Sequence, residues 1–393
     1  MNMRVLFAIH GPADEGTAVY RSVRHRVDAL REHGHHADLL AAGDLRGRGP
    51  ARLDPLLLAP ALSRRRLASY DAVVFHSHLG WAFHAARPWL DPERRVVTIT
   101  SFHGLEPIYY SALGRELARR GERLSSRFRL LHGHVLPRLL RFSCRQSDAV
   151  FCLNTPEVEY LTSHAWAVPD RIYRLANGVE ADCFMDRMPA ARVRRLLFVG
   201  QWLPAKGTRD LIEAFSALSG RADLELACVG TGAPEAQVLA DFPEAVRGRV
   251  RVRPRVDRGA LHAELAHADL FVFPSLSEGF SNALLEAMAA SLPIDATPVG
   301  AAADLLRDGV NAAVVPAADA AALTARIESL LMHADARAAL GRAAQATARE
   351  YEMRQVNDRF VQQLMHVMEW RPLARTPAAE AAESQQRWRH VEQ

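Results

Sequence analysis

The sequence predicts an α/β protein made of two doubly wound domains, each with a largely parallel sheet, that face a central cleft. Short apolar runs alternate with helical patterns in both halves of the chain, which is typical of sheets covered by helices. A chain of 393 residues is longer than an ordinary domain with one hydrophobic core, and it suits two domains of similar size. Because ligands bind at the carboxyl ends of such strands, we expect functional residues there.

Five apolar segments are predicted strands of the first domain. A helical pattern over residues 18–34 lies between the first two of them and ends on Gly34, a usual helix C-terminal stop. Residues 184–195 show no clear period and contain Pro189, so we place the linker there. The five strands are residues 4–10, 37–42, 72–77, 95–102 and 149–154.

The second half repeats this alternation, and a last helical pattern over residues 343–370 follows its final strand. The predicted strands are residues 195–200, 224–230, 250–256, 270–275 and 292–297. The resulting division is a first domain (1–185), a second domain (186–345), a C-terminal helix that packs back on the first domain (346–370) and a mobile tail (371–393).

Composition restricts the class of protein. A net charge of +4 is too mild to indicate nucleic-acid binding, and 49% hydrophobic with 24% charged residues is ordinary for a globular protein. The four cysteines form no Cys-x-x-Cys pair, so neither a disulfide framework nor a zinc site is indicated. No apolar run approaches the roughly 18 residues of a transmembrane helix. We therefore expect a soluble cytoplasmic protein, with binding at the inner face of a membrane left open.

Lys206 is the only lysine among the 49 basic residues of the chain. It follows the strand of residues 195–200 and precedes a helix predicted to begin near Thr208, where backbone N–H groups and the helix dipole favour an anion. Lysine is a compact point charge, whereas arginine is a larger planar fork, so a tight phosphate pocket could accept only the first. The alternative is that one lysine remains by chance in an arginine-rich chain.

The segment PSLSEGFSNALLEAMAASLP, residues 274–293, places two acids eight residues apart. Glu278 lies in the loop after a strand, and Glu286 lies in the second turn of the following helix. The N–H groups of the loop and first turn could hold a diphosphate, and each carboxylate could accept hydrogen bonds from sugar hydroxyls. The alternative is a helix-capping Glu278 and a solvent-facing Glu286.

Four other segments of the chain carry recognisable motifs. They are HGPADEGTAVYRSVRHRVDALREHGHHADLL (10–40), TSFHGLEP (100–107), RIYRLANGVEADCF (171–184) and VGQWLPAKG (199–207). With the segment at 274–293, and in this order, they resemble family 4 glycosyltransferases. Members of that family are retaining nucleotide-sugar enzymes with the GT-B fold of two Rossmann-like domains. The resemblance covers residues 4 to about 370.

The resemblance implies that the second domain binds a nucleotide sugar. Lys206 would bind the donor diphosphate without a metal ion or other cofactor, Glu278 would hold the transferred sugar, and Glu286 would hold the ribose. Gln201 would lie at the same site, at a position where the family usually has an arginine. The N–H groups of four loop residues would complete the diphosphate site; they are Gly279, Phe280, Ser281 and Asn282. Ser281 stands where the family commonly has a glycine. Serine is tolerated at this position only if its φ is negative.

The resemblance also implies roles in the first, acceptor-binding domain. Gly16 would let its loop approach the diphosphate, and Asn177 and Gly178 would lie at the domain junction. His103 would face the anomeric carbon and the acceptor, as a catalytic residue with Lys206 and Glu278. From its own position His103 is notable only because it follows the carboxyl end of a predicted strand, and a structural role is the alternative.

Residues 114–147 contain nine arginines against two glutamates, with apolar residues at roughly helical spacing. Such a basic amphipathic segment could contact an anionic membrane or an acidic acceptor, and the alternative is a solvated helix face.

The sequence therefore predicts a retaining glycosyltransferase that moves a sugar from a nucleoside diphosphate to a hydroxyl of a glycan, a lipid-linked molecule or a small molecule. Two alternatives are a sugar-nucleotide-binding protein that has lost catalysis and a relative that epimerises or phosphorolyses sugars. The motifs do not specify the sugar, the base or the acceptor.

Overall fold

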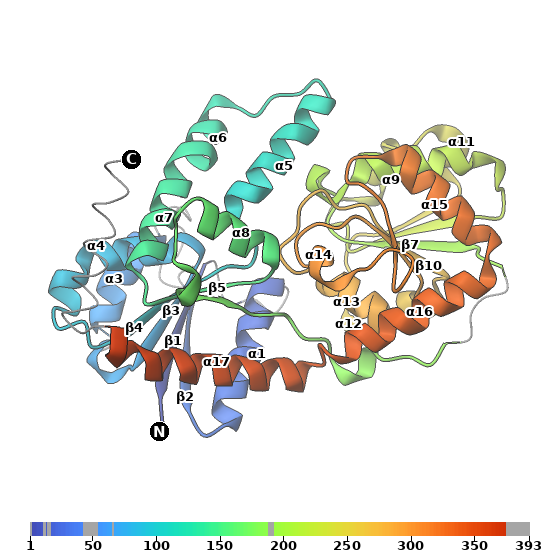
Figure 1. Ribbon diagram of the computed structural model, residues 1–393. Helices are drawn as coiled ribbons and strands as arrows, with labels where there is room; N and C mark the ends of the chain where they lie inside the picture. Colours follow the sequence, from blue (N-terminus) through green and yellow to red (C-terminus); the bar gives the residue numbers. More distant parts are fainter. Residues whose placement is uncertain are drawn as a thin grey trace.

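Two lobes, each built around one six-stranded parallel sheet, make up the protein (Figure 1). The computed structural model describes residues 2–10, 13, 17–41, 54–64, 67–187 and 192–374. Helices cover both sheets, so the predicted pair of doubly wound domains is confirmed. The predicted position of Gly16, part of the predicted linker and the tail beyond residue 374 lie outside the described residues.

The first sheet has the strand order β2-β1-β3-β4-β5-β6. Its strands are β1 (Arg4–Ile9), β2 (His36–Ala41), β3 (Ala72–His76), β4 (Val97–Ser101), β5 (Ala149–Cys152) and β6 (Ile172–Arg174). Five were predicted. The short edge strand β6 was not, because its three residues are only partly buried and form no apolar run. The helices of this part are α1 (Ala18–Glu32), α3 (Asp54–Arg64), α4 (Gly80–Leu90), α5 (Glu106–Arg119), α6 (Ser126–Leu130), α7 (Leu136–Gln146) and α8 (Thr155–Ser163).

The second sheet has the strand order β12-β11-β10-β7-β8-β9. Its strands are β7 (Arg195–Val199), β8 (Glu225–Val229), β9 (Val250–Arg253), β10 (Leu270–Phe273), β11 (Ile294–Ala296) and β12 (Ala313–Val314). Strands β9 and β10 end earlier than predicted because Pro254 and Pro274 follow them and cannot donate to a sheet. The helices are α9 (Thr208–Ala217), α10 (Glu235–Ala240), α11 (Glu244–Arg247), α12 (Arg258–His267), α13 (Asn282–Ala289), α14 (Ala302–Leu305), α15 (Ala320–Met332) and α16 (Ala334–Arg349).

The C-terminal helix returns to the first domain, but it is not the continuous helix over 343–370 that the sequence predicts. Helix α16 ends at Arg349 and α17 (Met353–Ala374) begins after a break. At the break the chain pairs with Val179, whose N–H donates to the Tyr351 carbonyl and whose carbonyl accepts from the Met353 N–H. Helix α17 then runs beneath the first sheet (Figure 1) and buries Phe360 and Leu364 in its core. The domain limits at 185 and 345 remain predictions.

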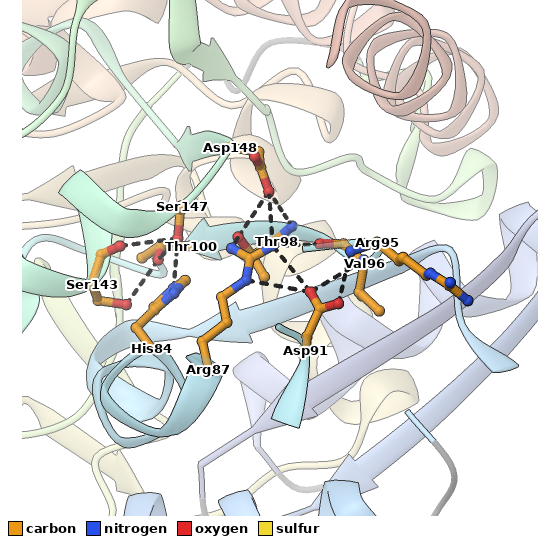
Figure 2. A network of polar contacts seen from close by, with 10 residues as sticks. All are labelled: His84, Arg87, Asp91, Arg95, Val96, Thr98, Thr100, Ser143, Ser147 and Asp148. Atoms are coloured by element: carbon orange, nitrogen blue, oxygen red, sulfur yellow. Dashed lines mark hydrogen bonds and ion pairs between the residues drawn. The ribbon is translucent and has the colours of Figure 1, made fainter. Parts of the chain in front are cut away.

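A buried polar network fixes α7 to the first sheet (Figure 2). Arg87 of α4 donates to Asp91, to Thr98 and to the Val96 carbonyl, and Thr98 also binds Asp148. Beside it, Thr100 binds the hydroxyls of Ser143 in α7 and of Ser147 just after α7. Ser147 also binds His84. Every polar group of Arg87 that is buried here has a partner, which is the usual state of a buried charge.

Helices α5 to α7 form an extension that projects from the first lobe (Figure 1), with a π-helical turn over Leu131–Val135. Leu130, Leu131 and Val135 are exposed where α6 continues into this turn. At the end of α5, Arg119 pairs with Glu116 and with Asp210 of the second domain. No helix within the described ranges is long and apolar enough to cross a bilayer.

Candidate active site

Lys206 and Glu278 meet at the carboxyl ends of two paired strands, β7 and β10. The Lys206 ammonium lies 2.6 Å from Glu278 Oε1, which also accepts a 2.8 Å hydrogen bond from the Ser275 hydroxyl. About a quarter of the Lys206 side chain is exposed, whereas Glu278 is largely buried. The predicted cation and the predicted sugar-binding acid therefore belong to one site.

Gly207 allows this approach. It has φ of +68°, and a Cβ added there would lie 1.8 Å from the Pro274 carbonyl oxygen. Only glycine avoids both the left-handed strain and this clash. The loop after β7 is thereby held directly against the loop that carries Glu278.

The N-terminus of α13 presents a row of N–H groups. Ser281 is the N-cap, with φ of −80°, and its hydroxyl accepts from the Leu284 N–H, so the requirement placed on this position is met. Within the described chain, the N–H groups of residues 279–283 donate no hydrogen bond. Such a row at a helix N-terminus favours an anion.

The first domain touches this loop directly. A Cβ on Gly279 would lie 2.6 Å from the His103 carbonyl oxygen and 2.8 Å from the Gly104 Cα, so the two backbones are in close contact. Asn154, which caps α8, donates a 2.9 Å hydrogen bond from its amide to the Gly279 carbonyl. The His103 backbone therefore lies beside the loop that carries Glu278.

The His103 ring stacks on the buried His76 ring, with centroids 4.6 Å apart. Burial, and then the positive charge of Arg26, lowers the pKa of His103 to about 3. The ring is thus neutral at pH 7. Its Nε2 and both nitrogens of His76 have no hydrogen-bond partner among the described residues.

Asn177 connects the two domains across the cleft. Its Oδ1 accepts from Ser22 of α1 at 3.1 Å, and its Nδ2 donates to Asn282 of α13 at 2.9 Å. A Cβ on the neighbouring Gly178 would lie 2.7 Å from the Met353 Cα, where the chain crosses back. Both residues are thus at the domain junction.

Glu286 faces a pocket of about 210 Å³ between the domains, which α1, the 176–180 segment, α12 and α13 line. Burial raises the pKa of Glu286 to about 7, although the charges of Arg21 and Arg258 act in the opposite direction. Glu286 is therefore not the solvent-facing acid of the alternative interpretation.

Two predicted donor-site residues contribute less than expected. The Gln201 side chain is exposed at the end of β7. The Phe280 ring packs near the Tyr351 ring, 6.1 Å between centroids, so only its backbone can face the site. Conversely, sequence reasoning missed Arg26, His76 and Asn154, which lie on different elements and share no motif.

One group of three residues could offer ligands to a metal ion in the described chain: Asp182, Cys183 and His262. The Cys183 sulfur lies 3.3 Å from His262 Nε2, and Asp182 pairs with Arg258. Burial and then the charge of Glu286 raise the pKa of Cys183 to about 12, so the sulfur is a neutral thiol. The group is satisfied as a hydrogen-bonded and ion-paired cluster.

Comparisons with known proteins agree with this geometry. Residues 193–333 match the family described as "Glycosyl transferases group 1", and residues 19–182 match "Glycosyltransferase Family 4". A D-inositol 3-phosphate glycosyltransferase of Xylanimonas cellulosilytica is 30% identical over 52% of this chain and 54% of its own. A GDP-mannose-dependent alpha-mannosyltransferase of Mycolicibacterium smegmatis is 27% identical over 77% of this chain and 82% of its own. The chain thus spans about half of the first relative and most of the second.

Solved structures show the same fold. Sucrose-phosphate synthase from Thermosynechococcus elongatus superposes with a TM-score of 0.76 at 19% identity, over 94% of this chain and 100% of that one. The Anabaena protein HepE in complex with UDP-glucose superposes with a TM-score of 0.66 at 16% identity, over 93% and 100%. The two facing sheets therefore define a protein of the GT-B class. With both halves matched by their family profiles, the chain belongs to glycosyltransferase family 4.

Proposed function

We propose that the protein is a retaining, metal-independent glycosyltransferase that moves a sugar from a nucleoside diphosphate to a hydroxyl acceptor. The observation that carries this proposal is the Lys206–Glu278 pair beside the unpartnered N–H groups of residues 279–283. The names of relatives support it: one is GDP-mannose-dependent, and HepE was solved with UDP and glucose. The donor base and sugar are left open by these two cases.

Each side chain has a task that its chemistry suits. The diphosphate binds the Lys206 ammonium and the N–H groups at the start of α13. Glu278, held by Ser275, accepts hydrogen bonds from hydroxyls of the transferred sugar. Glu286 accepts them from the ribose diol in the interdomain pocket.

The transfer then proceeds on one face of the sugar. The bond from the anomeric carbon to the phosphate oxygen breaks, and negative charge grows on the departing diphosphate. The acceptor oxygen forms its bond to the same carbon on the same face, and its proton goes to the departing phosphate oxygen. Preorganised donors such as Lys206 and the loop N–H groups stabilise this charge, typically by about 10²- to 10³-fold in rate per donor. The neutral His103 borders this space from the first domain.

The test is a nucleotide-release assay after thermal-shift screening with UDP-, GDP-, ADP- and dTDP-sugars. Lys206→Ala should lose about 10²-fold or more in turnover and bind the donor more weakly. Lys206→Arg should also be poor if the pocket excludes a planar fork. Arg209→Ala is the matched control, because Arg209 lies one turn away and pairs on the surface with Glu213. Unchanged turnover of Lys206→Ala contradicts the assignment, and donor binding without turnover by the native protein indicates a binding protein instead.

We also propose that the α5–α7 extension contacts an anionic membrane surface, which would place the enzyme in the cytoplasm at the inner face of the cell membrane. Exposed Leu130, Leu131 and Val135 share this extension with six exposed arginines that form no ion pair in the described chain. These arginines are Arg115, Arg123, Arg127, Arg129, Arg138 and Arg141. Apolar residues beside basic ones are typical of interfacial helices.

Co-sedimentation with vesicles distinguishes this contact from a solvated surface. The native protein should bind vesicles with 30 mol% anionic lipid at low salt. Each basic residue near the surface should contribute on the order of 1 kcal/mol to the binding free energy. Leu130→Glu with Leu131→Glu should abolish binding and leave nucleotide release unchanged. Absence of binding by the native protein at low salt rejects the membrane contact.

A further inference from the structure

Arg26 is a buried cation with no ion-pair partner among the described residues. It lies on the face of α1 that buries Val23, Val27 and Leu30, and only 5% of it is exposed. Its Nη2 has no hydrogen-bond partner, and no carboxylate pairs with it among the described residues. Arg87, buried to the same degree in the same domain, has four hydrogen bonds from its guanidinium (Figure 2). The contrast shows that the fold can satisfy a buried arginine, and that it does not do so here.

The environment of Arg26 makes its charge costly. Burial lowers its pKa to about 10, so the guanidinium still carries its proton at pH 7. Its guanidinium lies over the Phe360 ring, 5.7 Å from the centroid, and a cation–π contact offsets only a small part of the desolvation of a charge. A buried charge of this kind requires an anion, and the described chain does not provide one.

The position of Arg26 indicates where that anion binds. Arg26 lines the interdomain pocket together with Asn177, Asn282 and Glu286. It lies one turn after Ser22, which binds Asn177, which in turn binds the first residue of α13, Asn282. Ser22 and Arg26 are four residues apart on α1 and therefore share one face of the helix, and both line this pocket.

Other unpartnered donors face the same region. His76 and His103 are close enough to Arg26 for its charge to lower the pKa of both rings, and both nitrogens of His76 and the Nε2 of His103 lack a hydrogen-bond partner among the described residues. On the opposite side are the N–H groups of residues 279–283. Polar groups of both domains that have no hydrogen-bond partner among the described residues therefore border this part of the cleft.

The cations that the second domain places near this pocket are already paired, Arg258 with Asp182 among them. The single lysine of its site is already paired with Glu278 at 2.6 Å, and Gln201 at the end of β7 is neutral. A diphosphate therefore meets little net positive charge from that side. A second cation from the first domain would supply it.

We propose that Arg26 binds a phosphoryl oxygen of the donor diphosphate from the first-domain wall, opposite Lys206 and the start of α13. This inference rests on the proposed function. It adds a charged side chain of the first domain to the donor site, and it gives Arg26 a binding role that costs the empty protein stability. Replacing Arg26 should therefore weaken diphosphate binding and at the same time stabilise the empty protein, and these two effects can be measured separately.

The experiment compares the native protein with Arg26→Met by calorimetric titration of the nucleoside and the nucleoside diphosphate of the base selected by thermal shift. Affinity for the nucleoside should stay within about twofold. Affinity for the diphosphate should fall by about tenfold or more, the usual effect of losing one charge-assisted hydrogen bond. The melting temperature of the empty protein should rise, because methionine fills the apolar face without a buried charge.

Two variants complete the design. Arg26→Lys keeps a charge and should retain part of the diphosphate affinity, and Arg24→Met is the control, since Arg24 is on the same helix, largely exposed and paired with Asp28. Unchanged diphosphate affinity in Arg26→Met overturns the proposal, and so does a change confined to the KM of the acceptor, which would assign the anion to the acceptor. A native protein that binds no nucleotide at all overturns the proposed function as well, so the two failures are distinguishable.

Discussion

Replacing Glu286 by glutamine should stabilise the empty protein above pH 7 and weaken its binding of the ribose. Burial in the interdomain pocket raises the pKa of this carboxyl from 4.5 to about 7. Arg21 and Arg258 lower it and Asp182 raises it, but burial dominates. The folded protein therefore retains a proton at pH 6 that the unfolded chain has already lost.

The size of the effect follows from proton linkage. One pKa unit corresponds to about 1.4 kcal/mol, so a shift from 4.5 to about 7 corresponds to about 3 kcal/mol. Because the folded pKa is raised, the contribution of Glu286 is fully favourable below pH 4.5 and is lost as the pH rises to about 7. Glutamine has no charge to bury, so Glu286→Gln should not show this loss.

The assay is urea denaturation of the native protein and Glu286→Gln at intervals from pH 4.5 to 8.5. Burial also raises the pKa of other carboxyl groups, among them that of Glu157 to about 7, so only the difference between the two curves isolates Glu286. That difference should grow by about 3 kcal/mol between pH 4.5 and 7.5, mostly above pH 5. A difference that does not change with pH refutes the reasoning.

The same titration should appear in binding. A ribose diol donates hydrogen bonds, which a carboxylate accepts better than a carboxylic acid, so binding favours the ionised form of Glu286. Affinity for the nucleoside should therefore rise with pH up to about 7 and then level off. The nucleoside is the probe because it carries no phosphate that titrates in this range. Glu286→Gln should bind weakly at every pH.

Three glycine and asparagine substitutions test the geometry around this pocket. Gly207→Ala should lower the free energy of unfolding by well over 2 kcal/mol in denaturation. The control is Gly232→Ala, which should cost about 1 kcal/mol because Gly232 has a similar left-handed φ but open space around it. Equal losses would contradict the clash with Pro274. Asn177→Ala removes both hydrogen bonds of the domain bridge and should cost about 2 kcal/mol of unfolding free energy, while an unaffected value would mean that the bridge contributes nothing. Gly279→Ala should lower turnover tenfold or more with nucleoside affinity kept, because its Cβ would displace the His103 backbone; normal turnover would show that this contact is dispensable.

Local features of the sequence predicted most of the fold. Ten of the strands are recognisable in the sequence as apolar runs. The predicted bounds of these strands were wrong mainly at their ends, where prolines such as Pro254 stop the pairing. The short edge strands β6 and β12 have too few residues to show a pattern. The break between α16 and α17 depends on the pairing of Val179 with residues 351–353, which no local pattern of the C-terminal segment indicates.

The candidate site divides in the same way. Lys206, Glu278 and Glu286 were accessible from sequence because each follows a strand in the same sheet, and parallel order brings strand ends together. Arg26 was not, because a single arginine in an amphipathic helix of an arginine-rich chain looks like a surface residue. Its burial comes from α17, which packs against α1 and places Phe360 beside the guanidinium.

The distribution of charge across the cleft explains the two unusual basic residues together. Lys206 has to fit between Gly200, which lies beside its stem, and Glu278, whose oxygen it contacts; this space suits an ammonium better than a planar fork. Because that ammonium is shared with Glu278, it cannot by itself balance a departing diphosphate, whose negative charge grows during transfer. A second cation on the opposite domain would act only when the domains lie together, as Asn177 and the Gly279 contact hold them here. Catalysis would then depend on closure of the cleft, since neither wall alone carries enough positive charge for the leaving group.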